Sequence, residues 1–300
     1  VPVIIPEQAG YQYQWYNLGV PIDSATLSTY TAKEVGYYKA YVTNAFGCSA
    51  YTPPLTVTTV PDCVWPGDAN HDEQVNNLDL LYIGLYYAST GFPRSTISNI
   101  YTAFYAEDWG IKGMMGDAKQ IDCNGDGTID NKDTVAVNLN FNAQRQYSRL
   151  PEYTHSGTAI PSLYLETPKT NYKAGEWVNA GVMLGTSADP VEELCGIAFN
   201  IDYDVAMIEA GSASLTYPAS WLATPGVNAL TYSKTNTAEG TIYGAEIGTT
   251  HNNKDGHGKI ADLRFKLKSG ITKTEALDLK ISSFAVNAFA EKIPFFSTPF

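Results

Sequence analysis

Hydrophobic and polar residues alternate with a period of two near both ends of the chain. Near the start, aromatic and polar residues alternate from Tyr11 to Tyr16 and again over 36–44. Beyond residue 150 the alternation returns in separate runs, at 178–184, 197–203, 263–267 and 277–281. A period of two, interrupted by Gly, Pro and Asn, is typical of strands with one buried face. Both ends are therefore predicted to be β-sandwiches.

The central segment has a different pattern. Two acidic stretches are each followed by apolar residues at helical spacing, Leu78, Leu81 and Leu85 after the first, Val135 and Leu139 after the second. This spacing predicts two short helices. The chain is therefore mainly β with a small α part, and we expect three domains, at 1–60, 61–150 and 151–300.

The composition narrows the class of protein. The chain has 300 residues, which suffices for two or three domains, and 21 of them are Tyr. A net charge of −12 argues against nucleic acid or an anionic membrane as partner. No run approaches the roughly 20 apolar residues of a membrane span. The opening Val-Pro-Val-Ile-Ile-Pro shows no signal peptide, so we expect a mature chain or a piece of a longer one.

The clearest motif is an acidic twelve-residue stretch that begins at Asp122, here called loop two. Gly127 at position 6 permits a sharp turn, and Ile129 at position 8 ties the stretch to a core. Such a loop wraps one hard cation with oxygen ligands, as Ca²⁺ requires, whereas the alternative is a metal-free Asn/Asp/Gly turn. The predicted Ca²⁺ ligands, at positions 1, 3, 5, 7, 9 and 12, are Asp122, Asn124, Asp126, Thr128 through its carbonyl, Asp130 and Asp133.

An earlier stretch, here called loop one, repeats this ligand pattern from Asp68. Val75 again stands at position 8, but Glu73 replaces the glycine of position 6. If that position needs a positive φ, a non-glycine residue costs about 1–2 kcal/mol. Loop one is therefore expected to bind Ca²⁺ more weakly, through the corresponding residues Asp68, Asn70, Asp72, Gln74, Asn76 and Asp79.

Cysteine is sparse, with four residues at 48, 63, 123 and 195. This number and spacing fit neither a disulfide scaffold nor a zinc site. Cys63 and Cys123 each lie close to a loop, so a bridge between them is geometrically plausible. Whether it forms is left open.

The duplicated loop-helix unit resembles a dockerin. Both loops end in Asp, not in the Glu of an EF-hand, and the string Trp65-Pro-Gly-Asp-Ala-Asn with Asp122-Cys-Asn-Gly-Asp-Gly is similar to dockerin-like modules of Bacteroidota-type secreted proteins. The resemblance covers most of 62–142 and implies Ca²⁺-dependent binding of a protein partner. Loop positions 10 and 11 are then the recognition residues. They are Asn77, Leu78, Asn131 and Lys132, and the two pairs differ from each other.

An insertion at about 88–120 departs from the dockerin pattern. It is rich in aromatic residues, among them Phe92, Tyr105 and Trp109. Two interpretations are open, a lid over a small module core and an aromatic platform for sugar or a protein partner. We favour the lid, because so small a module needs additional apolar surface.

The two flanking segments resemble known β-sandwiches. The run from Trp15 through Gly36-Tyr-Tyr to Cys48 resembles the Ig-like repeats of bacterial surface proteins, with Trp15 in the core, Tyr38 as an anchor and the first strands lacking. Ala174-Gly-Glu-Trp-Val, Cys195-Gly-Ile-Ala-Phe and the stretch 258–267 resemble a cohesin, a jelly-roll sandwich that receives dockerins. We expect no closing strand in the last residues of the sandwich, which read Ile293-Pro-Phe-Phe-Ser-Thr-Pro-Phe.

Together these features predict a non-catalytic, secreted or cell-surface assembly protein. No nucleophile, phosphate-binding or dinucleotide motif is present, so an enzyme is not expected. A donor and a receptor module on one chain can link copies head to tail into a filament or surface layer, and strand exchange or truncation would explain the incomplete ends. The alternative is an accessory or adhesin region of a larger secreted enzyme that binds polysaccharide.

Overall fold

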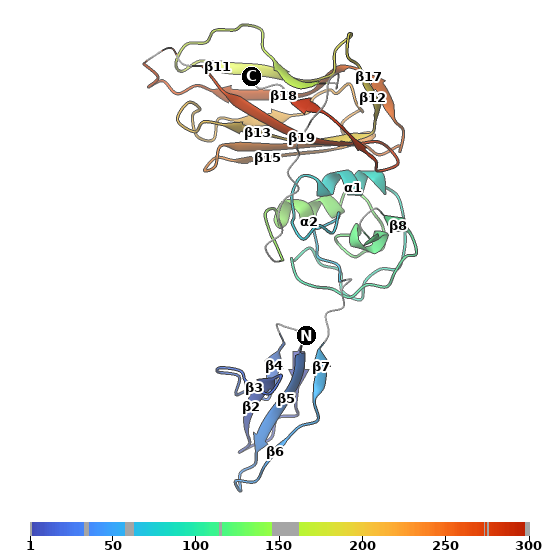
Figure 1. The fold of residues 1–300 in the computed structure, drawn as a ribbon, viewed down its shortest axis with the longest axis vertical. Coiled ribbons are helices and arrows are strands. Elements are labelled where there is room, and N and C mark those ends of the chain that lie inside the picture. The colour runs from blue at the N-terminus through green and yellow to red at the C-terminus, as the bar shows by residue number, and fades with distance from the viewer. Residues whose placement is uncertain are drawn as a thin grey trace. The chain divides into compact units, whose positions relative to one another are not determined.

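The computed structural model describes residues 2–32, 36–57, 63–113, 116–145, 162–272, 274 and 276–297. The chain forms two compact units, Val1–Asp62 and Cys63–Phe300 (Figure 1). The second unit contains both the segment with the acidic loops and the C-terminal strands. We call the first of these, residues 63–145, the loop module.

The first unit is made of short strands around one aromatic core. Trp15 and Tyr38 are the largest buried side chains in it, 1% and 2% exposed, in agreement with the predicted alternation. Strands β3, β2, β5 and β6 form one sheet, with β7 also paired to β5, and β1 pairs with β4. These strands are β1 (Pro2–Ile4), β2 (Gln12–Asn17), β3 (Val20–Pro21), β4 (Thr29–Thr31), β5 (Gly36–Thr43), β6 (Ser49–Tyr51) and β7 (Leu55–Val57).

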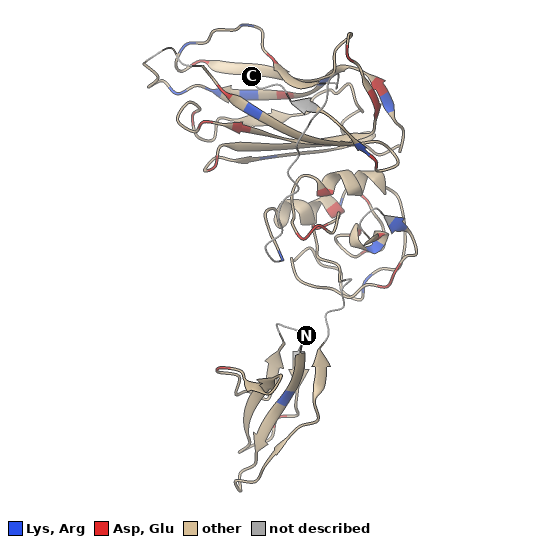
Figure 2. Ribbon diagram, viewed as in Figure 1, with Lys and Arg blue, Asp and Glu red and all other residues tan. Residues whose placement is uncertain are grey.

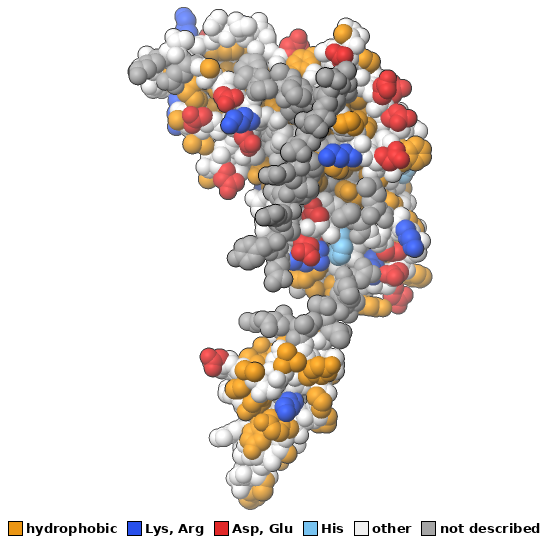
Figure 3. Space-filling view, in the orientation of Figure 1, with side chains coloured by type: hydrophobic (Ala, Val, Ile, Leu, Met, Phe, Trp, Pro, Cys, Tyr) orange, Lys and Arg blue, Asp and Glu red, His pale blue; other side chains and the backbone are white. Residues whose placement is uncertain are grey.

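One described strand, β1, precedes the strand that carries Trp15, whereas an immunoglobulin domain has two there. Several large hydrophobic side chains of this unit are exposed, among them Leu27 and Phe46, and the face visible in Figure 3 shows many hydrophobic and few charged side chains. Tyr51 packs against Tyr16 and Tyr41 at ring-centroid distances of 5.5 and 4.8 Å, with Lys39 above it.

The C-terminal part of the second unit is a β-sandwich, which confirms the mainly β prediction. One sheet has the order β14-β18-β11-β10-β21 and the other β15-β16-β13-β19-β20. The alternating residues Ile197, Phe199 and Ile201 of β13 are buried between the sheets. The strands are β10 (Ser162–Glu166), β11 (Trp177–Leu184), β12 (Val191–Leu194), β13 (Gly196–Tyr203), β14 (Ser214–Thr216), β15 (Ala229–Asn236), β16 (Thr241–Gly248), β17 (Lys254–Gly256), β18 (Gly258–Lys266), β19 (Leu279–Val286), β20 (Lys292–Ile293) and β21 (Phe296–Ser297).

The expected lack of a closing strand is wrong. Strand β21 pairs in parallel with the start of β10, with Phe296 opposite Ser162. The preceding Phe295 is fully buried in the sandwich core. A strand of two residues is too short to show an alternating pattern, so the sequence could not reveal it. Residues 298–300 lie outside the described residues.

The loop module contains two short helices, as predicted. They are α1 (Asp79–Leu85) and α2 (Asp133–Leu139), and the insertion adds β8 (Lys112–Gly113), β9 (Gly116–Asp117) and the 3-10 turn η1 (Ala118–Gln120). Cys123 is wholly buried in the module core and forms no disulfide with Cys63. The red ribbon segments of the loop module in Figure 2 mark its acidic residues, several of them next to the helices.

The insertion lies along the backbone of loop two. Ser98 and Arg94 donate their backbone N–H groups to the carbonyls of Asn124 and Gly125, at 2.9 and 3.0 Å. Arg94 is 7% exposed and also donates through Nη2 to the Cys123 carbonyl at 2.9 Å. These contacts support the lid interpretation of this segment, although Phe92 and other aromatic side chains remain exposed.

Candidate metal loops and docking face

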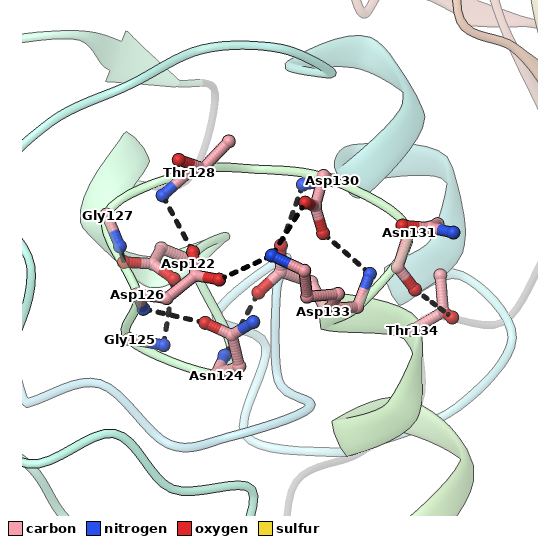
Figure 4. A network of polar contacts seen from close by, with 11 residues as sticks. Asp122, Asn124, Gly125, Asp126, Gly127, Thr128, Asp130, Asn131, Asp133 and Thr134 are labelled. Carbon is pink, nitrogen blue, oxygen red and sulfur yellow. Dashed lines mark hydrogen bonds and ion pairs between the residues drawn. The ribbon is translucent and has the colours of Figure 1, made fainter.

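Loop two is folded around its own carboxylates (Figure 4). Asp122 accepts hydrogen bonds from the backbone N–H groups of Gly125 and Gly127, at 2.8 and 3.0 Å. The two oxygens of Asp133 accept from the N–H groups of Asn124 and Asp130, at 3.0 and 2.9 Å. The first and last residues of the loop thereby hold its backbone in a closed turn.

The remaining predicted ligands of loop two continue this network. Asn124 accepts from the Asp126 N–H at 2.7 Å, and Asp126 accepts from the Thr128 N–H at 3.1 Å. The Lys132 ammonium lies between the free carboxylate oxygens of Asp126 and Asp130, at 3.0 and 3.2 Å. A cation thus already sits among the carboxylates of this loop, although Lys132 is 63% exposed.

Loop one repeats part of this network. Asp79 accepts from the N–H groups of Asn70 and Asn76, at 3.1 and 2.7 Å, as Asp133 does in loop two. Asp68, however, is bound by the guanidinium of Arg145, with 2.7 Å between Nη2 and Oδ2. Its other oxygen has no hydrogen-bond partner among the described residues. Arg145 was not singled out by the sequence, because it lies far along the chain from the loop.

The backbone of loop one carries the strain expected at Glu73. Its φ is +75°, where Gly127 of loop two has +88°. His71 also has a positive φ, +59°, at the place where loop two has Gly125 at +85°. Two side-chain-bearing residues therefore occupy a left-handed conformation that costs each about 1–2 kcal/mol. The strain at Glu73 was predicted from the sequence, and that at His71 was not.

Several of these carboxylates are buried, and the positive charges of Arg145 near Asp68 and Arg94 near Asp122 offset the effect of burial only in part. Burial raises the pKa of Asp133 to about 7. Burial likewise raises the pKa of Asp68 to about 7, against the opposing effect of Arg145. Asp79 is fully buried, and its pKa lies well above the usual value for the same reason. A bound cation stabilises the charged form of such desolvated carboxylates, because it replaces the stabilisation that water gives an exposed carboxylate.

The donor set fits Ca²⁺ in chemistry and spacing. It consists of carboxylate, amide and carbonyl oxygens, and Ca²⁺ takes about six to eight such ligands. The orphaned Oδ1 of Asp68 and Oε1 of Gln74 are both buried in loop one. No group of three or more Asp, Glu, His or Cys side chains converges as a ready metal site in the described parts of the chain. The carboxylate oxygens are instead hydrogen-bonded to backbone N–H groups or paired with the side chains of Lys132 and Arg145.

The predicted partner residue Asn77 is buried against the β-sandwich of the same chain. Its Nδ2 donates to the carbonyl oxygens of Phe199 and Gly244, at 3.0 and 2.9 Å, and to Oδ1 of Asn200 at 3.0 Å. These acceptors lie on the neighbouring strands β13 and β16. Asn77, a partner residue implied by the dockerin resemblance, thus donates to the backbone of β13 and β16, and the sequence did not indicate these acceptors.

Helix α1 lies directly on this sheet. A Cβ atom added at Gly84 would stand 2.3 Å from Cγ2 of Ile247, so only glycine permits this approach of the helix to β16. Leu81 lies between Asn77 and Gly84 on the same helix face by its spacing, and it is fully buried. One hydrophobic cluster runs without interruption from the module core into the outer face of the sheet.

Phe141 adds an aromatic contact beside α1. Its ring stacks on Tyr232 at 5.7 Å and meets Tyr243 edge-on at 4.8 Å. The Lys234 ammonium lies 4.8 Å from the same ring and donates to the Asn138 carbonyl at 3.0 Å. Phe141 was not predicted from the sequence, because only the fold brings it to β15 and β16.

The corresponding face of the second half is exposed. Asn131 and Lys132 occupy the loop positions of Asn77 and Leu78 but lie at the surface. Val135 and Leu139, which correspond to Leu81 and Leu85, are 51% and 64% exposed. The structure therefore brings one predicted pair of partner residues into an interface and leaves the other pair in solvent.

Comparison with solved structures finds cohesin chains whose similarity covers about half of this chain. A type II cohesin of the Acetivibrio cellulolyticus cellulosome is 14% identical, with 47% of this chain and 93% of the cohesin covered and a TM-score of 0.38. Type II cohesin A11 of Bacteroides cellulosolvens is 13% identical, with 46% and 95% covered and a TM-score of 0.37. A chain of a type I cohesin–dockerin complex of Clostridium thermocellum is 15% identical, with 49% and 95% covered and a TM-score of 0.38.

No protein-family model matches the chain, and no curated protein matches it in sequence. No helix in the described part is long and apolar enough to cross a membrane. The function is therefore inferred from the contacts between the loop module and the sheet.

Proposed function

We propose that the chain is a non-catalytic structural protein of the cell surface or the secreted fraction, which assembles through a complementary pair of modules. The observation that carries this proposal is the burial of Asn77 and α1 on the outer face of β13 and β16. A buried side-chain amide whose two N–H groups point at three acceptors in a largely apolar interface indicates a specific contact, because misplacing it leaves buried polar groups unpaired.

Ca²⁺ is the proposed stabiliser of the loop module. The oxygen donors of both loops, and the burial of their carboxylates Asp68, Asp79, Asp122 and Asp133, support this assignment. When bound, Ca²⁺ would supply the positive charge around which the loop oxygens gather. The ligands are those predicted from the sequence, with Asp122 and Asp133 as the buried ends of loop two.

Assembly follows from the same interface. The loop module and the sheet are different surfaces, so a module that docks on the sheet of another copy makes a heterologous contact. Repetition of such a contact generates a head-to-tail filament unless the rotation closes a ring. We propose that the pair seen within one chain also forms between chains, by exchange of the module.

The test compares Gly84→Leu with Asn138→Leu, because Asn138 holds the matching position on the exposed face of α2. Light scattering across a concentration series, with Ca²⁺ or with chelator, measures the mass. The wild type and Asn138→Leu should form larger species in Ca²⁺, whereas Gly84→Leu should not, since its side chain collides with Ile247. A wild type that stays monomeric at high concentration with saturating Ca²⁺ would contradict filament formation. Retardation in polysaccharide gels would then favour the accessory role.

A further inference from the structure

The loop module has two halves, loop one with α1 and loop two with α2. The segment after each helix donates backbone hydrogen bonds to the loop of the other half. After α2, Asn142 donates its N–H to the Val75 carbonyl at 2.8 Å and Arg145 to the Glu73 carbonyl at 3.1 Å. After α1, Ala88 donates to the Ile129 carbonyl at 2.8 Å and Gly91 to the Gly127 carbonyl at 3.0 Å. Counted from the first Asp of each loop, Arg145 and Gly91 hold the same position. One of these two equivalent positions therefore carries a guanidinium and the other carries no side chain.

The guanidinium is well held in loop one. Its Nη2 lies 2.7 Å from Oδ2 of Asp68, whose side chain is fully buried, while the Arg145 side chain is 16% exposed. Cζ of Arg145 lies 5.5 Å from the centroid of the Trp65 ring, and the backbone N–H of Arg145 is held by its hydrogen bond to the Glu73 carbonyl. Removing one partner of a buried ion pair leaves the other charge buried and uncompensated, which strongly destabilises the fold.

Among the described residues, no carboxylate of loop two forms such a buried ion pair, although the guanidinium of Arg94, 7% exposed, interacts electrostatically with Asp122 and Asp133. A Cβ at Gly91 would stand 1.9 Å from Cδ2 of Trp109, so the lid fills the space that the guanidinium has in loop one. Arg94 donates to the carbonyls of Cys123 and Ser98, not to a carboxylate. Lys132 does reach two carboxylates, but it is mostly exposed, and exposed pairs contribute little.

We infer that Arg145 is the resident positive charge of loop one, so that the first half of the module keeps its fold without Ca²⁺ and only the second half depends on the metal. The inference rests on the proposed calcium loops. The first half carries the docking face, Asn77 and α1, so removal of Ca²⁺ leaves α1 docked on the sheet. What Ca²⁺ controls is loop two and the exposed face of α2, with Val135 and Leu139.

Hydrogen exchange of the full chain, read by mass spectrometry with Ca²⁺ or with EDTA, tests this division. In the wild type, EDTA should speed exchange of peptides from 130–140 at least about tenfold and leave peptides from 76–86 nearly unchanged. In Arg145→Gln, EDTA should also speed exchange of 76–86 at least about tenfold, and added Ca²⁺ should restore protection.

Arg145→Lys and Lys132→Gln are the matched controls. Arg145→Lys keeps the charge and should retain much of the protection of 76–86 in EDTA, whereas Lys132→Gln should leave those peptides as in the wild type. Equal loss of protection in both halves of the wild type, or no effect of Arg145→Gln, overturns the inference. Peptides from 76–86 that exchange freely even in Ca²⁺ contradict the docked interface itself, and thus the proposed function.

Discussion

Replacing Asn77 by Ala tests whether the contact between the loop module and the sandwich is specific. The side-chain amide has two N–H groups aimed at three acceptors, and Asn77 is 4% exposed. Each net hydrogen bond contributes about 1 kcal/mol. The truncation also removes a donor from the carbonyls of Phe199 and Gly244 in a buried interface. The expected loss is therefore about 2–3 kcal/mol.

Asn131→Ala is the matched control, because Asn131 holds the same loop position in the second half and lies at the surface. An exposed polar residue of this kind contributes less than about 0.5 kcal/mol when truncated. The two variants change the same atoms in equivalent loops. Any difference between them therefore reports the contact with the sandwich, not the loop itself.

Calorimetry of the full chain in saturating Ca²⁺ provides the measurement. For a unit of this size, about 2–3 kcal/mol corresponds to a fall in Tm of roughly 5–10 °C. Asn77→Ala should show this fall in the transition of the second unit, and Asn131→Ala should leave it almost unchanged. Equal shifts in the two variants would refute the view that Asn77 anchors the module to β13 and β16.

Three further predictions concern single positions. Asp126→Ala should abolish Ca²⁺ binding at loop two, so that added Ca²⁺ no longer raises thermal stability fully; a full rise would contradict the ligand assignment. Glu73→Gly should relieve the positive φ at that residue and raise stability by about 1 kcal/mol, seen as a higher urea midpoint. Burial raises the pKa of Glu246 to about 7 from 4.5, so this neutral carboxyl favours the fold below pH 4.5 and the advantage, about 3 kcal/mol, is lost as pH rises through 7. Glu246→Gln should lack this loss when urea unfolding is compared at pH 4.5 and 8, and an unchanged pH dependence would show that the carboxyl is not buried.

The buried position of Glu246 shows why such a group escapes sequence reasoning. It lies on β16 between apolar neighbours, is fully buried and accepts a hydrogen bond from Ser220 at 2.7 Å. Along the chain it is one acidic residue among many. Only the pairing of β16 with β13 and β15 places it on the inner side of a sheet.

The sequence by itself determined the local features of this protein. A period of two requires one buried face, so the alternation places Phe199 on the buried face of its strand, and the Ig-like resemblance implied the buried positions of Trp15 and Tyr38. The spacing of Asp, Asn and Gly in the loops determined their turns as well, including the strained φ at Glu73, because these hydrogen bonds join residues only a few positions apart.

The tertiary structure alone decided the contacts between distant segments. Arg145 reaches Asp68, Asn77 reaches β13 and β16, and β21 closes the sandwich beside β10. Side chains of these types occur throughout the chain, and no periodicity marks which of them meet. Their pairing is set by which hydrophobic faces bury each other, a property of the whole chain that a local pattern does not contain.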